Sequence, residues 1–141
     1  MKSNKAFTMV ELMVVVLIVG ILAAVAIPLM SGRVDASKWS EAKAAMGTIA
    51  TAIRAYAAEK GAAGVSATPS LADLGISTAE LDGTYFTTGC YAISDVAVSA
   101  SGVVSFKIVC TAATSTRSNK PSKPAKMTLT GSGTGQVFTE S

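Results

Sequence analysis

A continuous apolar run near the N-terminus constrains this chain more than any other feature. From Leu12 to Met30, 19 residues contain no charged side chain, and Gly20 and Pro28 are the only breaks in the apolar pattern. About 20 such residues are enough for a helix to cross the hydrocarbon core of a bilayer. The run therefore argues against disorder and against a purely soluble protein with a single core.

The charges that flank this run predict its orientation. Residues 1–6 read MKSNKA and are basic, so the positive-inside rule holds them in the cytoplasm and places the chain beyond Met30 outside. An ordinary secretory signal cleaved near Ala26 or Ala36 is an alternative. Glu11 does not fit that alternative, because a carboxylate at the edge of the hydrocarbon costs about 2.5 kcal/mol or more unless it finds a partner.

The remaining composition offers little for catalysis. The 141 residues include 12 basic and 9 acidic side chains, no histidine and two cysteines. Serine and cysteine nucleophiles therefore lack a histidine partner, and neither a phosphate-binding loop nor a calcium-loop pattern occurs. We expect a protein that is not an enzyme, with no cofactor, no catalytic residue and no metal site.

Nucleic-acid binding is also not supported. Without Lys2 and Lys5 the charges nearly balance, at 10 positive against 9 negative. The one basic cluster has four charges without interleaved aromatic residues, in a segment with two prolines that reads as a solvated loop. Its members are Arg117, Lys120, Lys123 and Lys126.

After Pro28 the pattern changes to that of an amphipathic helix. Six residues recur at spacings of three and four, which places them on one face of a helix: Trp39, Ala42, Met46, Ile49, Ile53 and Tyr56. This stripe suits either a coiled-coil seam or packing under a small sheet, and three heptads favour the sheet. We expect one helix from Phe7 to Lys60, with a hydrophobic part at 7–30, an amphipathic part at 31–61 and Gly61 as its stop.

The rest of the chain predicts a connecting loop and an antiparallel sheet. Residues 62–84 are rich in Gly, Ala, Ser, Thr and Pro, with Ser77 and Glu80 spaced as a capping box. Residues 85–141 suggest a hairpin that turns at 99–102, a third strand at 126–130 and a last strand at 136–139. The predicted fold class is therefore α+β, a long N-terminal helix packed by a small antiparallel sheet.

The hairpin register makes a specific prediction about the cysteines. Opposed residues whose numbers sum to about 200 place Ala92 opposite Ile108 and Cys90 opposite Cys110. Directly opposed residues lie within reach of a disulfide. We therefore expect a Cys90–Cys110 bond in an oxidising compartment, with two buried thiols as the alternative.

The N-terminal residues also carry a family resemblance. The sequence KAFTMVELMVVV, from Lys5 to Val16, followed by GILAAVAIP, from Gly20 to Pro28, resembles the N-terminus of a type IV pilin precursor. The resemblance implies that a prepilin peptidase removes residues 1–6 by cutting between Ala6 and Phe7, and that the new N-terminal Phe7 is methylated. Ala6 departs from the glycine usual before the cut.

The resemblance further implies assembly into a helical filament through the N-terminal helices. Cleavage creates an α-amino group with a pKa near 8, four residues before Glu11, so the amine of one subunit would pair with Glu11 of its neighbour. Local unwinding is implied at Gly20 and Pro28 inside the filament. The implied partners are further copies, the inner membrane before assembly, prepilin peptidase and the pilus assembly machinery.

Three functions remain open on the sequence alone. The first is a structural subunit of an extracellular type IV pilus, made as an inner-membrane precursor. The second is a pseudopilin of a type II secretion system, which forms a periplasmic filament; such proteins often carry a C-terminal calcium site, for which this C-terminus offers only Glu140. The third is a secreted soluble domain released by ordinary signal cleavage.

Overall fold

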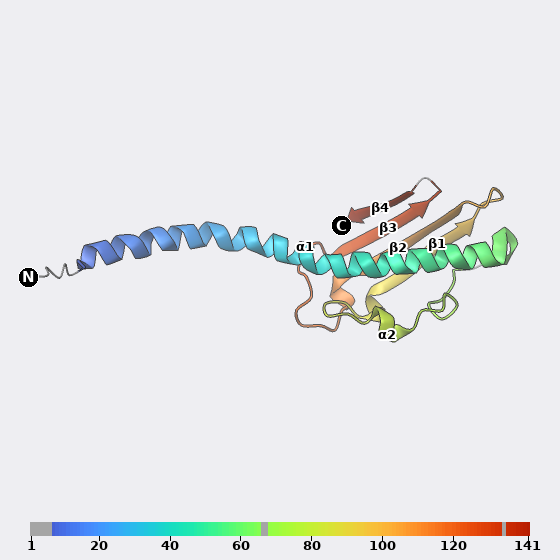
Figure 1. Ribbon diagram of the computed structural model, residues 1–141, viewed down its shortest axis with the longest axis horizontal. Coiled ribbons are helices and arrows are strands. Elements are labelled where there is room, and N and C mark those ends of the chain that lie inside the picture. Colours follow the sequence, from blue (N-terminus) through green and yellow to red (C-terminus); the bar gives the residue numbers. More distant parts are fainter. Residues whose placement is uncertain (1–6, 66–67, 134) are drawn as a thin grey trace, which may run out of the picture. The chain divides into compact units, whose positions relative to one another are not determined.

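The chain forms one long helix, a short helix and a four-stranded antiparallel sheet, which is the predicted α+β class (Figure 1). The computed structural model describes residues 7–65, 68–133 and 135–141. The helices and strands are α1 (Met9–Gly64), α2 (Thr78–Leu81), β1 (Tyr91–Val98), β2 (Val104–Thr111), β3 (Lys126–Ser132) and β4 (Gly135–Glu140), with short 3-10 turns at Thr88–Cys90 and Ala112–Thr114. The chain divides between Val34 and Asp35 into two compact units.

The first unit is helical throughout its described part after Thr8. Its helix runs without interruption through Gly20 and Pro28. The Ser31 hydroxyl donates to the Pro28 carbonyl at 2.9 Å. The unwinding expected at Gly20 and Pro28 concerns the assembled filament and stays a prediction.

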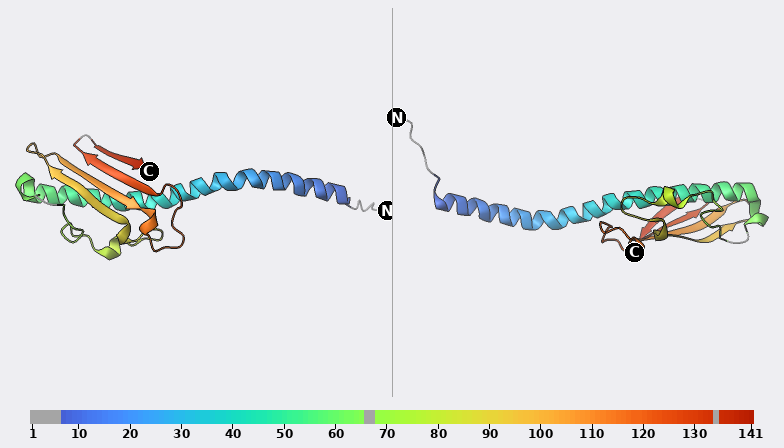
Figure 2. Two further views of the ribbon diagram at one scale, coloured as in Figure 1. Left: turned by 180° about the vertical axis from the view of Figure 1, so that it is seen from behind. Right: turned by 90° about the horizontal axis from the view of Figure 1, so that it is seen from below.

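The second unit is a two-layer head in which α1, from Asp35 onward, lies along one face of the sheet (Figure 2). Five members of the predicted stripe are buried: Trp39, Ala42, Met46, Ile49 and Ile53. Tyr56 is only half-buried, and Ala57 takes its place in the core. The reason is helical geometry, because a step of four from Ile53 follows the buried face better than a step of three.

The end of α1 lies close to the predicted stop. Gly61 has φ 67° and ψ 179°, which is not a helical conformation, and helical geometry resumes briefly up to Gly64. A positive φ is open to glycine at little steric cost. The Gly61 backbone therefore interrupts the helix where the sequence predicts its end.

The hairpin turns where expected, but its predicted register is wrong, by two residues next to the turn and by one residue near Cys110. Tyr91 lies opposite Cys110 and Ile93 opposite Ile108, so Ile93 faces the core while Ala92 is exposed. The register then shifts between Ser94 and Ala97, where Asp95 adopts φ 54°. A bulge adds one residue to one strand. Counting alternate residues from the turn therefore assigns the side chains beyond the bulge to the wrong face of the sheet.

The last two strands are longer than predicted. Met127 and Leu129 of β3 are fully buried, as the alternation indicates. Strand β3 continues to Ser132 because Gly131 lies opposite Phe106, and the missing side chain leaves room for the ring. Gly131, Ser132 and Gly135, which lie between the two predicted strands, are therefore also strand residues.

Candidate assembly site on the N-terminal helix

Thr8 and Glu11 form a closed hydrogen-bonded pair where α1 begins. The Thr8 backbone N–H and hydroxyl donate to Glu11 Oε2 at 2.9 and 2.7 Å, and the Glu11 N–H donates to Thr8 Oγ1 at 3.3 Å. This is a capping box, in which the side chains at the helix start satisfy free backbone donors. Glu11 therefore has a partner inside its own subunit, which was not predicted although the T-x-x-E spacing signals it.

Phe7 lies next to this pair. Its side chain is 81% exposed, and the amine that cleavage would create on it is one residue from Thr8. Ala6, the residue before the predicted cut, lies outside the described residues. The structure thus places Phe7 and Glu11 at one helix end, as the sequence predicts from their spacing.

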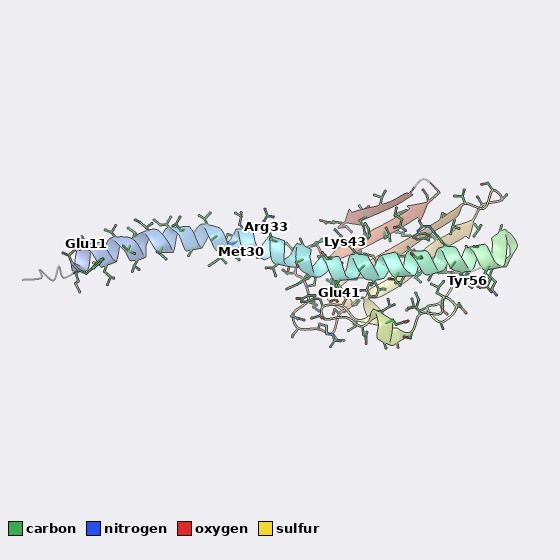
Figure 3. The ribbon with its side chains drawn as sticks, in the orientation of Figure 1. Glu11, Met30, Arg33, Glu41, Lys43 and Tyr56 are labelled. Atoms are coloured by element: carbon green, nitrogen blue, oxygen red, sulfur yellow. The ribbon has the colours of Figure 1, made fainter. Side chains whose placement is uncertain are left out.

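From Leu12 to Met30 the helix exposes large hydrophobic side chains and no charged one (Figure 3). All large hydrophobic side chains from Phe7 to Val34 are between 48% and 83% exposed. Within the described residues, α1 is the one helix long and apolar enough to cross a membrane. Its most apolar stretch of 18 residues has a mean hydropathy of 3.1, and none of that stretch is buried. A core helix of a soluble protein would be mostly buried, so this segment needs another cover.

Two carboxylates on the head half of α1 hold loops that are distant in sequence. Glu41 accepts the backbone N–H groups of Thr84, Tyr85 and Phe86 at 2.9 to 3.0 Å. A side chain at Gly83 would overlap the Glu41 carboxylate. Glu41 thus fixes the connection between α1 and the sheet, and its polar position off the apolar stripe gave no sign of this role.

Asp35 holds the connection between β2 and β3 in the same way. Its Oδ2 accepts from Ser122 N at 3.0 Å, Ser122 Oγ at 2.7 Å and Lys123 N at 3.0 Å, and Lys38 forms an ion pair with Oδ1 at 3.6 Å. The Ser122 hydroxyl is the main cause that lowers the pKa of Asp35 below its ordinary value, partly opposed by burial. Hydrophobic periodicity carries no signal for such a contact across nearly 90 residues.

The two cysteines are separate, buried thiols near the 3-10 turn Thr88–Cys90. Cys90 ends that turn, and Cys110 faces the core from β2, one residue out of the predicted register. Burial, and then the neighbouring Cys90, raise the pKa of Cys110 to about 12. The structure brings the two side chains together, and their bond remains a prediction.

The charged loops have internal roles. Lys120 donates from Nζ to the carbonyl oxygens of Ala113 and Ser115 at 3.2 and 2.9 Å. Asp82 accepts from the Thr88 N–H and hydroxyl, which lower the pKa of its carboxyl. Among the described residues, no three His, Cys, Asp or Glu side chains gather where they would hold a metal ion.

Known proteins match part of the chain. A family described as the prokaryotic N-terminal methylation motif matches residues 1–27. The chain is 47% identical over 57 residues to the type IV major pilin protein PilA of Myxococcus xanthus, covering 40% of this chain and 26% of that protein. It is 42% identical over 72 residues to the fimbrial protein EcpC of Eikenella corrodens, covering 46% of this chain and 47% of that protein.

A secretion protein matches the chain to a similar extent. The type II secretion system core protein G of Pseudomonas aeruginosa is 42% identical over 55 residues, which are 39% of each chain. The chain thus spans less than half the length of these curated relatives. No solved structure matches it. The chain therefore carries the prokaryotic N-terminal methylation motif, and its predicted resemblance to type IV pilins and their pilin-like relatives is confirmed over the N-terminal region.

Proposed function

We propose that this protein is a structural, non-enzymatic subunit of a type IV pilus that polymerises through its N-terminal helix. The observation that supports this most directly is the exposed apolar surface from Phe7 to Val34. Soluble monomers rarely expose contiguous apolar patches of more than a few hundred Å². Lipid covers this surface in the inner-membrane precursor, and helices of other copies cover it in the extracellular filament.

Processing prepares the helix for this exchange. Prepilin peptidase cuts between Ala6 and Phe7 and the new amine is methylated, which keeps it cationic. A mature protein that begins at N-methylated Phe7 is the expected result of mass analysis. A start at Ile27 or Ser37 would instead identify ordinary signal cleavage and a secreted soluble domain.

Glu11 then sets the register between subunits. In the single subunit Thr8 holds its carboxylate, so the acid resides at the membrane edge with part of its desolvation cost offset. In the filament the amine of a neighbouring Phe7 approaches the same carboxylate, which neutralises both charges. Breaking a buried pair of this kind costs about 3 to 5 kcal/mol.

The test compares two substitutions at this helix end in a strain without another major pilin. Glu11→Ala removes both the cap and the charge, and should leave the subunit in the membrane fraction while sheared filaments are lost. Thr8→Val removes only the hydroxyl and should reduce filament yield less. Glu59→Ala, which changes an exposed glutamate of the head half of α1, is the control. Normal filaments from Glu11→Ala would refute the registry role.

The alternative is a pseudopilin of a type II secretion system, favoured by the match to core protein G. Both functions use the same helix chemistry, so variants at Glu11 do not separate them. Deletion of the gene does: loss of surface filaments with normal protein secretion supports the pilus, and loss of secretion with normal piliation supports the pseudopilus.

We also propose that Cys90 and Cys110 become joined after export. The support is that both side chains are buried in one core cluster and that the neighbouring Cys90 contributes to the raised pKa of Cys110. Thiol–disulfide exchange with an oxidising protein disulfide transfers two electrons to that disulfide and leaves the Cys90–Cys110 bond in the head.

A further inference from the structure

A cleft of about 410 Å³ opens at one end of the sheet in the head. It lies between α1, the turn that joins β1 to β2, the end of β3 with Gly133, and the start of β4. Its described lining comprises Arg54, Gly102, Val103, Val104, Ser132, Gly133 and Gly135. One guanidinium, two valines and three glycines therefore define its chemistry.

Arg54 supplies the positive charge of the cleft. Its side chain is half-buried, and its guanidinium carbon lies 5.1 Å from the centre of the Phe106 ring. When the side-chain amide of Gln136 is oriented with its oxygen toward Arg54, that oxygen accepts hydrogen bonds from both terminal nitrogens of the guanidinium. Gln136 is neutral, and over the described part of the chain Arg54 forms no ion pair. The ring and the amide thus orient a guanidinium that still has unused donors.

The glycines keep the cleft open. Gly102 and Gly135 have φ of 80° and 147°, which residues other than glycine rarely adopt. A Cβ on Gly133 would lie 2.6 Å from Val103 Cγ1, so any side chain there would press on the apolar wall. The lining therefore consists largely of accessible backbone beside a fixed cation.

We propose that this cleft binds a small, singly charged carboxylate whose neutral body rests on Val103 and Val104. Gln136 takes one N–H from each terminal nitrogen of Arg54, so the edge formed by Nε and the adjacent terminal nitrogen is the one that can match a carboxylate with two parallel hydrogen bonds. A single cation balances one negative charge, whereas a phosphate group would carry nearly two. The valines provide apolar contact for the part of the ligand beyond the carboxylate.

The experiment titrates the isotope-labelled full chain in detergent and follows the amide signals of Gly102, Gly133 and Gly135 and the Arg54 Nε–H. Two probes carry the same carboxylate on different bodies: sodium glucuronate represents an acidic sugar, and N-acetylalanine represents a peptide end. Saturable shifts with either probe support the site, and the stronger one identifies the source. Glucose and the methyl ester of glucuronate, which lack the charge, should cause no saturable shift.

Three variants make the result decisive. Arg54→Gln should weaken binding about tenfold or more, since hydrogen bonds to charged groups contribute about 1.5 to 3 kcal/mol. Arg54→Lys keeps the charge but loses the fork and should bind more weakly than wild type. Arg117→Gln, at an exposed arginine outside the cleft, should bind as wild type does.

A further variant, Gly133→Val, tests the site if the Arg54 variants do not fold. It leaves the cation in place and narrows the cleft beside Val103. Burial of Trp39, read by fluorescence, confirms folding of each variant. Saturable binding lost in Gly133→Val supports the proposal. It is overturned if no probe causes a saturable shift, if the methyl ester binds as glucuronate does, or if folded Arg54→Gln or Gly133→Val binds unchanged.

Discussion

Two carboxylates on α1, those of Asp35 and Glu41, hold the loops of the head in place. Asp35 and Glu41 each gather three hydrogen bonds from a loop that periodicity alone leaves unattached. A carboxylate offers about four acceptor sites and suits such clusters of backbone donors. At the residue scale, therefore, polar side chains outside the apolar stripe hold the two long connections of the head.

Asp35 should make the stability of the head depend on acid pH. Its folded-state pKa is lowered, so its contribution is complete above the ordinary aspartate pKa and is lost as pH falls through the lower folded value. We expect Asp35→Asn to lower the free energy of unfolding by about 1 to 3 kcal/mol at pH 7, with the difference from wild type shrinking below about pH 4.

Urea unfolding followed by Trp39 fluorescence at several pH values measures this. Asp95→Asn is the control, because Asp95 is exposed and asparagine tolerates its positive φ. A difference between Asp35→Asn and wild type that persists unchanged to pH 2 would contradict the assigned role.

Two glycines should respond to alanine in opposite directions. A Cβ on Gly131 would overlap the buried ring of Phe106, so Gly131→Ala should destabilise the head by about 1 to 3 kcal/mol. Gly47 lies inside α1 with open space around it, so Gly47→Ala should stabilise it by about 0.5 to 1 kcal/mol. The urea unfolding midpoints of the two variants measure these changes in stability. Changes of the same sign in both variants would contradict the packing described at Gly131.

At the scale of elements, the hairpin shows how one residue moves a whole register. The positive φ of Asp95 marks the bulge that lets Ile93 and Val96 both pack against the core. The same shift places Tyr91, and not Cys90, opposite Cys110. Cys90 reaches the core from the preceding 3-10 turn instead.

The disulfide is the element-scale prediction. Oxidation should join β2 to the segment before β1 and stabilise the head by about 3 kcal/mol, since the closed loop has about 20 residues. The exported protein should be lighter by two thiol hydrogens, and alkylation under denaturing, non-reducing conditions should label neither cysteine. Cys90→Ala and Cys110→Ala should each lose the same stability as reduction, and two alkylated thiols would refute the bond.

At the scale of the whole molecule, the two units bury their surfaces differently. The core cluster of the head lies entirely within residues 39–129, and the exposed apolar side chains gather in residues 7–34. We expect a chain that begins at Arg33 to be soluble and monomeric with Trp39 buried, while the full chain needs detergent. Light scattering after gel filtration measures this, with Met46→Asp as a variant that should unfold the short chain. Aggregation of the short chain with Trp39 exposed would contradict an independent head.

The sequence by itself determined the apolar helix, the buried stripe from Trp39 to Ile53 and the order of the strands. These follow from composition and short-range spacing, which act through local backbone geometry and the burial of apolar surface. Only the tertiary structure decided the bulge at Asp95 and the burial of Ala57, in place of Tyr56, in the core. It also decided which distant loops donate hydrogen bonds to Asp35 and Glu41, and it formed the cleft beside Arg54. Each of these depends on which backbone donors, rings or turns meet a side chain across the fold, and such meetings leave no period in the sequence.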